Sequence, residues 1–344
     1  MKLIWHAENL SEVDWLRFIL GDLIDEEIVD LDLTYLGDHS IHVVSSNLAP
    51  LRAYEPYFRR CREAGKNIVL LHLSDEWFSG GYETYKYFDL VLRNYSTPLA
   101  RDPGIITLPL GYTNGMGDTP PIRPADQRAI AWSFAGEVKA SRLDMVKALS
   151  SLEPHAVTDT SPKPDRPATR LSKPDFKAQM GETVFAPCPM GNVVIDTWRM
   201  YESLESGCIP LVEARRTLDY FQELFGPHPI PTFRSWADAR RYCRRLIDDK
   251  PRLLQTQAEI AAWWAAVKDN TRAQLRQALT GPSHSADLQA FSRRAHNRYQ
   301  LLHEPLRLIG LLRHQSTRSL VRRLSRPMGP VKRILRETFR PRAA

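Results

Sequence analysis

Residues 184–213 read Val184-Phe-Ala-Pro-Cys-Pro-Met-Gly-Asn-Val-Val-Ile-Asp-Thr-Trp-Arg-Met-Tyr-Glu-Ser-Leu-Glu-Ser-Gly-Cys-Ile-Pro-Leu-Val-Glu213. An apolar run leads into a loop rich in proline and glycine, then an amphipathic segment from Asp196, then a second apolar run. This order predicts a strand, a loop, a helix and a strand. We expect free backbone N–H groups and the positive end of the helix dipole at the carboxyl edge of the sheet, where phosphates and hydroxyls bind.

The same alternation of apolar runs and amphipathic stretches continues on both sides, and it predicts an α/β fold with parallel strands covered by helices. We expect strands at residues 2–5, 41–45, 67–73, 90–93, 105–108, 129–134, 155–158, 183–186, 208–212 and 230–233. We expect helices at residues 54–64, 141–151, 174–180, 196–206, 215–225 and 236–248.

Residues 116–127 are rich in proline and glycine and read as an interdomain linker. We therefore expect two Rossmann-like domains, 1–120 and 121–250, each close to the usual size of a single core. Two further segments follow them, a helical extension at 251–312, which could brace one domain against the other, and a basic tail at 313–344.

Composition narrows the class of protein. The chain has 344 residues, of which 43% are hydrophobic and 25% charged, as in soluble globular proteins. No apolar run approaches the ~18 residues of a membrane-spanning helix. The first nine residues hold no signal-peptide core, so a cytoplasmic location is expected. The four cysteines form no C-x-x-C pair, which argues against a zinc knuckle or a disulfide framework.

Arg199 and Glu202 are three residues apart and share one face of the predicted helix near the sheet edge. A guanidinium neutralises a diphosphate without needing a metal, and a carboxylate accepts two sugar hydroxyls. The pair would then hold a nucleotide. The alternative, a solvated pair of helix charges worth a few tenths of a kcal/mol, stays open.

Three short motifs occur in order, as Pro189-Met-Gly191, Arg199-Met-Tyr-Glu202 and Gly207-Cys-Ile-Pro210. Together they resemble the donor-binding segment of exostosin-type glycosyltransferases, including the related ribitol xylosyltransferases. Upstream, Trp132-Ser-Phe-Ala-Gly136 followed by Arg142 resembles the opening of the same families' donor domain. The resemblance spans roughly residues 65–215.

This resemblance implies a GT-B fold, in which two Rossmann-like domains face a central cleft, and inverting chemistry that needs no metal or other cofactor. It implies a nucleotide-sugar donor, with a UDP-sugar favoured. The donor-binding residues that it implies are Gly136, Arg142, Pro189, Gly191, Arg199 and Glu202. For Arg142, a plain surface charge remains the alternative.

Inverting transfer needs a base for the acceptor hydroxyl. Asp75 and Glu76 follow a strong strand, and adjacent carboxylates raise one another's pKa, so both are candidates; capping of the next turn is the alternative. His6 and His72, near strand ends, are further candidates for the base. The triplet Asp30-Leu-Asp32 matches a metal-binding pattern, but alternating acids on a solvent face explain it better.

The basic tail carries ten Arg and Lys against one acid, a charge of +9 that leaves 7 − 9 = −2 for the body. Apolar residues at near-helical spacing among its arginines predict amphipathic helices that dock on an anionic membrane surface. A disordered solubilising tail is the alternative. Nucleic acid is not an expected partner, because Phe339 is the only aromatic residue in the tail.

Two hypotheses of function follow. In the first, the protein transfers a sugar from a nucleoside diphosphate to a glycan, polyol-phosphate or lipid-linked acceptor, in the synthesis of a bacterial surface polysaccharide. In the second, it is a non-catalytic basic protein that docks on membranes or polyanions and retains a degenerate Rossmann pair. Arg199 and Glu202 separate the two, since a docking protein needs neither beside a glycine loop.

Overall fold

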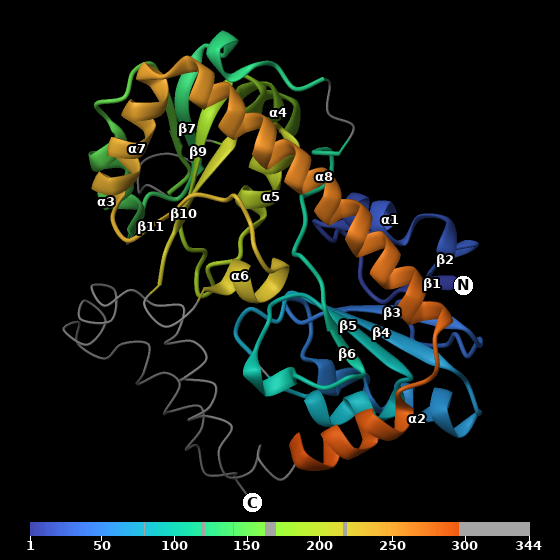
Figure 1. The fold of residues 1–344 in the computed structure, drawn as a ribbon. Helices are drawn as coiled ribbons and strands as arrows, with labels where there is room; N and C mark the ends of the chain where they lie inside the picture. The colour runs from blue at the N-terminus through green and yellow to red at the C-terminus, as the bar shows by residue number, and fades with distance from the viewer. Residues whose placement is uncertain (79, 118–120, 140, 162–169, 216–218, 296–344) are drawn as a thin grey trace, which may run out of the picture.

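The computed structural model describes residues 1–78, 80–117, 121–139, 141–161, 170–215 and 219–295. Two parallel sheets form its two halves (Figure 1). The strand order is β2-β1-β3-β4-β5-β6 in the first sheet and β11-β10-β9-β7-β8 in the second. The predicted α/β class, with two parallel sheets and covering helices, is confirmed.

The first sheet consists of β1 (Lys2–Trp5), β2 (Glu26–Val29), β3 (Ser40–Ser45), β4 (Ile68–Leu73), β5 (Leu90–Arg93) and β6 (Ile105–Thr107). Every residue of β3, β4 and β5 is buried, as expected of strands covered on both faces. The strand β2 was not predicted. It is an exposed edge strand that starts with two glutamates, and so it lacks the apolar run that marks its neighbours.

Two helices, α1 (Val13–Leu20) and α2 (Glu55–Glu63), cover this sheet. The predicted helix at 54–64 is α2. Just after α2, Gly65 adopts a φ of 71°, a left-handed conformation that glycine takes without the steric cost of a side chain. Its N–H donates to the carbonyl of Arg62, which closes the helix end.

The second sheet consists of β7 (Ile130–Gly136), β8 (His155–Asp159), β9 (Thr183–Cys188), β10 (Ile209–Glu213) and β11 (Thr232–Phe233). Its helices are α3 (Ser141–Leu149), α4 (Lys173–Gly181), α5 (Trp198–Glu205), α6 (Tyr220–Phe225) and α7 (Trp236–Asp248). Each predicted strand of this half is present, with ends shifted by up to two residues.

Two predicted helix starts in this half were wrong. The helix expected from Asp196 begins at Trp198, and Asp196 lies in the preceding loop, where its side chain accepts a hydrogen bond from the Tyr220 hydroxyl. The helix expected from Arg215 begins at Tyr220, capped by the side chain of Asp219. Arg215 lies outside any helix and pairs with Glu213 instead.

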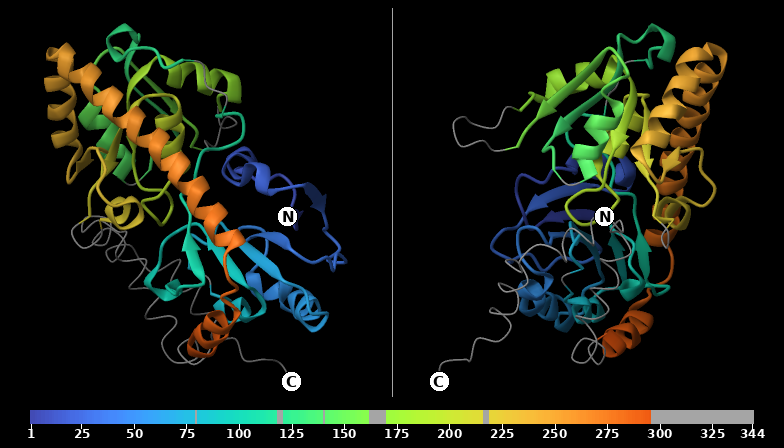
Figure 2. Two further views of the ribbon diagram at one scale, coloured as in Figure 1. Left: turned by 45° about the vertical axis from the view of Figure 1, so that its right-hand side comes forward. Right: turned by 90° about the vertical axis from the view of Figure 1, so that its left-hand side faces the viewer.

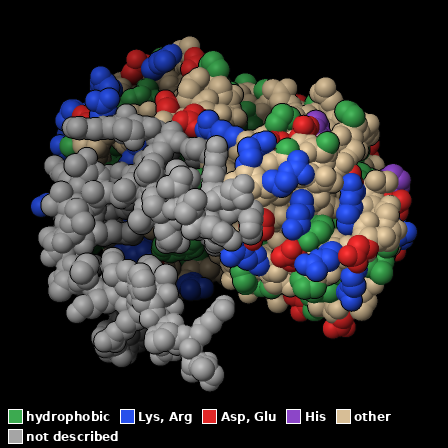
Figure 3. Space-filling model, turned by 90° about the horizontal axis from the view of Figure 1, so that it is seen from below, with side chains coloured by type: hydrophobic (Ala, Val, Ile, Leu, Met, Phe, Trp, Pro, Cys, Tyr) green, Lys and Arg blue, Asp and Glu red, His purple; other side chains and the backbone are tan. Residues whose placement is uncertain are grey.

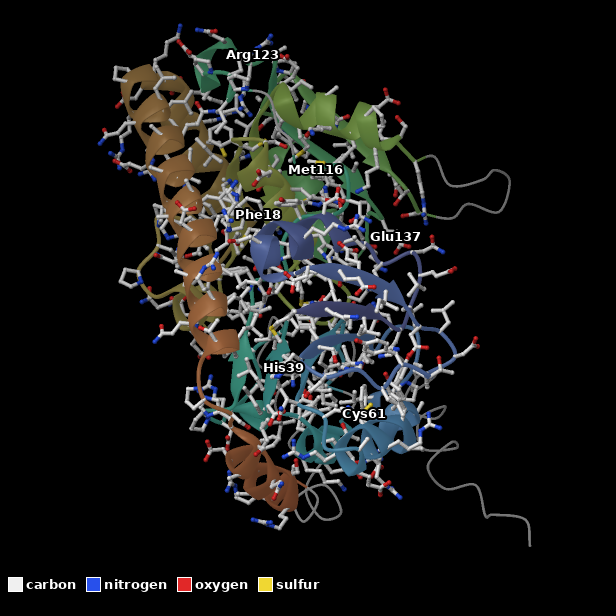
Figure 4. The ribbon with its side chains drawn as sticks, turned by 90° about the vertical axis from the view of Figure 1, so that its right-hand side faces the viewer. Phe18, His39, Cys61, Met116, Arg123 and Glu137 are labelled. Carbon is white, nitrogen blue, oxygen red and sulfur yellow. The ribbon has the colours of Figure 1, made fainter. Side chains whose placement is uncertain are left out.

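The long helix α8 (Lys250–Thr280) crosses from the second half to the first (Figures 1 and 2). Its Trp264 stacks on Trp15 of α1, with ring centroids 5.7 Å apart, and also packs against Tyr201 of α5. Such aromatic pairs contribute about 0.5–1.5 kcal/mol beyond the apolar area they bury. In Figure 4, Phe18 of α1 faces α8, where Lys268 lies 5.4 Å from its ring.

After α8, residues 283–295 return to the first half. Ser283 donates to Asp89, Leu288 is fully buried, and Phe291 stacks on Tyr85. The predicted bracing by helices in 251–312 is therefore observed for residues 251–295, as far as the structure describes them. The rest of that extension and the basic tail at 313–344 lie outside the described residues.

The surface of the first half carries both signs of charge, with Lys and Arg interspersed among Asp and Glu (Figure 3). Several of these residues form exposed ion pairs, such as Lys86 with Glu55 and Arg294 with Asp102. Exposed pairs of this kind contribute between 0 and about 1 kcal/mol each. In the part of the chain that the structure describes, no helix is long and apolar enough to cross a membrane.

Candidate functional site

Two half-buried arginines, Arg142 and Arg199, lie at the carboxyl ends of β7 and β9. Arg142, on the first turn of α3, donates to the carbonyl of Glu137 at 3.0 Å and to that of Met190 at 3.2 Å. These two carbonyls belong to the loops after β7 and β9. Arg142 therefore ties together the two loops that the sequence predicts to bind a donor, and the alternative of a plain surface charge does not describe its position.

A second guanidinium lies beside the first. Arg199 of α5 donates to the carbonyl of Ala135 and lies over the ring of Phe134, 4.5 Å from its centroid. Arg142 is 5.8 Å from the same centroid. Burial lowers the pKa of Arg142, and the nearby positive charge of Arg199 lowers it further. Burial also lowers the pKa of Arg199.

Among the described residues, neither guanidinium forms an ion pair with a carboxylate, although Glu202 and Glu137 contribute weaker attraction at longer range. Two neighbouring, half-buried cations repel each other and have lost part of their hydration, so the site favours a ligand that supplies negative charge. A diphosphate has this charge and offers acceptor oxygens for the planar guanidinium forks.

The predicted glycines allow close approach at this place. A Cβ atom on Gly136, the last residue of β7, would lie 3.2 Å from Arg199 Nη2 and equally near the ring of Phe134. A Cβ on Gly191 would lie 3.2 Å from Thr197 Cγ2. The N–H of Gly191 donates to the carbonyl of Val194 at 2.9 Å, which makes a tight turn of this loop. Pro189 is buried directly after β9.

Glu202 lies one helical turn after Arg199 and is 7% exposed. It accepts a hydrogen bond from the hydroxyl of Thr113, in the segment that follows β6, and lies 3.8 Å from Lys173 Nζ. Lys173 also donates to Thr113. Glu202 thus faces the first half rather than bulk water, and a solvated helix pair does not describe it.

The two predicted base candidates have different surroundings. Asp75 is fully buried in an ion pair with Arg93, 3.1 Å away, and accepts a 2.7 Å hydrogen bond from Tyr82. Glu76 is half-buried, and burial raises its pKa, an effect that a hydrogen bond from Asn192 and the charge of Lys139 partly offset. Both of these neighbours belong to the second half, so Glu76 faces the loops that carry the two arginines.

Strained backbone surrounds Glu76. Ser74 and Tyr95 follow β4 and β5 with φ values of 59° and 62°, and Asn9 follows β1 with a φ of 57°. Residues other than glycine rarely adopt this left-handed conformation, which costs of order 1–3 kcal/mol and tends to cluster at functional sites. Three loops at the carboxyl edge of the first sheet, after β1, β4 and β5, therefore share this feature.

Sequence reasoning missed two buried carboxyls at the same edge. Glu12, in the loop after β1, is 2% exposed, and burial raises its pKa to about 7 while the Ser74 hydroxyl partly offsets the shift. Asp196 is 1% exposed, and burial likewise raises its pKa to about 7. Asp196 could have been noticed as an acid within an otherwise apolar run; Glu12 carries no comparable signal.

The two histidines predicted as further base candidates, and Asp30 of the triplet set aside as a metal site, serve the packing of the first half. His6 bonds to His42 at 2.9 Å, and His72 lies between the hydroxyls of Ser46 and Tyr85. Burial lowers the pKa of His72 to about 4. Asp30 accepts from the N–H groups of Thr34 and Tyr35 and so shapes a turn. Among the described residues, no three His, Cys, Asp or Glu side chains gather as a metal site would require.

The fold has known counterparts, although neither a scan of protein-family models nor a search of curated proteins finds a match. The structure is similar to that of an α1,3-fucosyltransferase, with a TM-score of 0.52 and 13% identity over 84% of this chain and 92% of that one. It is also similar to HepE from Anabaena in complex with UDP and glucose, with a TM-score of 0.51 and 10% identity over 81% and 99%. The GT-B fold predicted from the sequence is therefore confirmed.

Proposed function

We propose that this protein is a glycosyltransferase that moves a sugar from a nucleoside diphosphate to an acceptor hydroxyl. One observation carries the proposal: Arg142 and Arg199 lie side by side on Phe134, largely desolvated and without a carboxylate partner among the described residues. Their position at the carboxyl ends of β7 and β9 is where α/β folds bind nucleotides.

The donor would lie along α5 in this proposal. Its diphosphate would take the place next to the two guanidiniums, at the carboxyl ends of β7 and β9. Its ribose hydroxyls would donate to Glu202, whose carboxylate already accepts a hydrogen bond from the hydroxyl group of Thr113. A UDP-sugar is the favoured donor, in line with the UDP bound by HepE, and membership of the exostosin-type group remains part of this proposal.

The chemistry is a single in-line displacement, which inverts the anomeric configuration. The acceptor oxygen forms a bond to the anomeric carbon, while the bond from that carbon to the diphosphate oxygen breaks. The proton of the acceptor hydroxyl passes to Glu76, whose raised pKa suits a general base. The negative charge that develops on the departing diphosphate is met by Arg142 and Arg199, so no step calls for a metal.

Asp75 has a supporting role in this scheme. Its carboxylate forms a fully buried ion pair with Arg93 and accepts a hydrogen bond from Tyr82. These two contacts fix the position of Asp75 beside Glu76. Glu76 is then the single base that an inverting displacement needs. We propose a glycan or polyol-phosphate as the acceptor, within the synthesis of a bacterial surface polysaccharide. Residues 313–344 would bring the enzyme to the inner face of a membrane, near a lipid-linked acceptor.

The test measures binding of UDP, GDP and CMP to the whole chain by calorimetry, and then hydrolysis of the corresponding nucleotide sugars. At 100 times its dissociation constant, a bound nucleotide should stabilise the fold by about 2.7 kcal/mol. Arg199→Ala should weaken nucleotide binding by about 2–4 kcal/mol, which is roughly 30- to 700-fold in dissociation constant. Glu202→Ala should weaken binding of the nucleotide but not of inorganic diphosphate.

The matched control is Arg241→Ala, which removes an exposed arginine that pairs with Asp238 on α7. This variant should bind nucleotides as the wild type does. An absence of binding by every nucleotide, or equal binding by Arg199→Ala and the control, would remove the basis for this function. The non-catalytic docking protein would then be the better description.

A further inference from the structure

The segment that follows β6 carries a hydroxyl group that reaches α5 of the second half. Thr113, in this segment, is 7% exposed, and its hydroxyl donates to Oε1 of Glu202. The same hydroxyl oxygen accepts a hydrogen bond from Lys173 Nζ of α4, an ammonium group that can only donate. Two hydrogen bonds therefore run in one direction from Lys173 through Thr113 to Glu202, and the first half supplies the middle member.

The position of Thr113 is set by contacts within the first half. The side chain of its neighbour Asn114 donates to the carbonyl of Leu10 at 2.8 Å and accepts from the N–H of Asp14 at 3.1 Å. The N–H of Met116 donates to the carbonyl of Thr113 at 3.1 Å, which closes a turn. The hydroxyl is therefore fixed in place by bonds that do not involve α4 or α5.

The two oxygens of the Glu202 carboxylate have different surroundings. Oε1 accepts from Thr113 and lies 3.8 Å from Lys173 Nζ. Among the described residues, Oε2 accepts no hydrogen bond, although Glu202 is only 7% exposed. Because a largely buried carboxylate gains from donors at both oxygens, Oε2 favours a ligand that carries hydroxyl groups. Such a ligand would lie beside Arg199, one helical turn earlier on α5.

We propose that Thr113 is a positioning residue for the nucleotide: its hydroxyl holds Oε1 of Glu202, so that Oε2 is aimed at the hydroxyls of a ribose. The inference rests on the proposed function. It narrows the donor to the ribonucleotides, as against nucleotides without ribose hydroxyls. It also gives the first half a part in donor binding, through one side chain.

Lys173 explains why the hydroxyl matters for the aim of the carboxylate. Its ammonium group is half exposed and close to Oε1, and Thr113 bonds to both groups. Without the hydroxyl, a direct charge-assisted hydrogen bond to Lys173 becomes the strongest contact open to Glu202. The carboxylate would then turn towards α4, and a ribose would lose its acceptor.

The experiment measures dissociation constants by calorimetry with the full chain. UDP, GDP and CMP are screened first, and the tightest binder is compared with its 2′,3′-dideoxy analogue and with inorganic diphosphate. Thr113→Val replaces the hydroxyl with a methyl group of similar size. We expect it to weaken binding of the nucleotide roughly 3- to 10-fold, a part of what a hydrogen bond to a charged group contributes. Binding of the analogue and of diphosphate should not change, because neither has a hydroxyl for Glu202.

Three further variants separate the aim of the carboxylate from a structural role. Thr113→Ser keeps the hydroxyl and should bind as the wild type does. Thr113→Val/Lys173→Met removes the competing cation, so the affinity for the nucleotide, relative to that for diphosphate, should be partly restored. The matched control is Thr271→Val, which removes a buried hydroxyl of α8 that donates to the carbonyl of Val267. It should leave all three dissociation constants as they are.

Each outcome has a distinct meaning. Wild-type protein that binds none of the three nucleotides overturns the proposed function itself. If the wild type prefers the nucleotide to its dideoxy analogue, Glu202→Ala loses this preference and Thr113→Val keeps it, the positioning role is overturned and the function stands. Tighter binding of the nucleotide by Thr113→Val would mean that the hydroxyl competes with the ribose, and an equal loss for all three ligands would mean a structural role. Either result also overturns this inference.

Discussion

Arginines at the carboxyl edges of the two sheets have different partners. In the first half, Arg93 is completely buried and meets the carboxylate of Asp75 and the hydroxyl of Tyr85. In the second half, Arg142 and Arg199 donate to backbone carbonyls and share one aromatic ring, but among the described residues no carboxylate pairs with them. Both arrangements lie at the carboxyl ends of parallel strands.

The difference separates a structural charge from a functional one. In the buried ion pair of Arg93 and Asp75, each charge is neutralised by the other. Loss of Arg93 would leave the Asp75 carboxylate buried without a partner, so Arg93 stabilises the loop that carries Asp75 and Glu76. Arg142 and Arg199 form an incomplete pair, because among the described residues no carboxylate lies within ion-pair distance of either, and Glu137, Glu213 and Glu202 attract them only at longer range. A ligand with negative charge would complete the arrangement. Mutation should therefore affect folding in the first half and binding in the second.

The largest effect should come from breaking the complete pair. Arg93→Met leaves the Asp75 carboxylate buried without its partner, which should lower the free energy of unfolding by about 3–5 kcal/mol. Denaturant titration followed by tryptophan fluorescence measures this change. The double variant Arg93→Met/Asp75→Asn removes both charges and should regain part of the loss. A single variant as stable as the wild type would contradict the structural role of the pair.

An intermediate effect should appear as a dependence of stability on pH. Burial raises the pKa of Asp196 from 3.8 to about 7, so the folded state retains a proton that the unfolded state loses. The stability that this group contributes is therefore complete below pH 3.8 and is lost as the pH rises towards 7, by up to about 1.4 kcal/mol per pH unit.

Asp196→Asn removes this titration and keeps an acceptor for the Tyr220 hydroxyl, which donates at 2.9 Å. Between pH 5 and 6.5, the wild type should lose stability more steeply than the variant. Unfolding curves at four pH values across this range measure the two slopes. Equal slopes would mean that Asp196 is ionised in the folded protein.

The smallest effect on stability should come from the incomplete pair. Arg199→Met removes a desolvated cation and relieves its repulsion with Arg142, so the free energy of unfolding should change by no more than about 1 kcal/mol. The contrast with Arg93→Met sharpens the comparison, because both variants replace an arginine with methionine, one at a fully buried ion pair and one at a half-buried site without such a pair. A loss of several kcal/mol in Arg199→Met would mean that both arginines are structural.

Much of the fold could be predicted because parallel strands are buried on both faces and appear as apolar runs. The prediction of secondary structure failed for elements that are exposed to solvent on one side. The edge strand Glu26–Val29 has no such run. The start of α6 at Tyr220 depends on Asp219, whose carboxylate accepts a hydrogen bond from the N–H of Gln222, and the apolar pattern of the sequence does not show this cap. Local patterns of this kind do not reveal tertiary contacts.

The candidate site shows the same division. The sequence places Gly136 and Gly191 at the ends of two strands and Arg142 and Arg199 on the helices that follow, and the structure brings Gly136 and the two arginines together around Phe134. Their role in binding a donor stays a prediction. The ion pair of Asp75 with Arg93 could not be predicted, because the two residues are 18 positions apart and meet only where β4 and β5 lie side by side. The influence of Asn192 and Lys139, which belong to the second half, on the pKa of Glu76 also leaves no local signature in the sequence.

The helix α8 also constrains how the halves can move. At one end, the side chain of Gln257 is bonded to the carbonyl of Gly207 in the second half, and at the other, Arg276 pairs with Asp22 in the first. A motion that opens the molecule must bend this helix or pivot about the stacked rings of Trp264 and Trp15. The stacked rings of Trp264 and Trp15 therefore form, between the two end contacts of α8, a further link between the halves, besides the chain connection between the sheets.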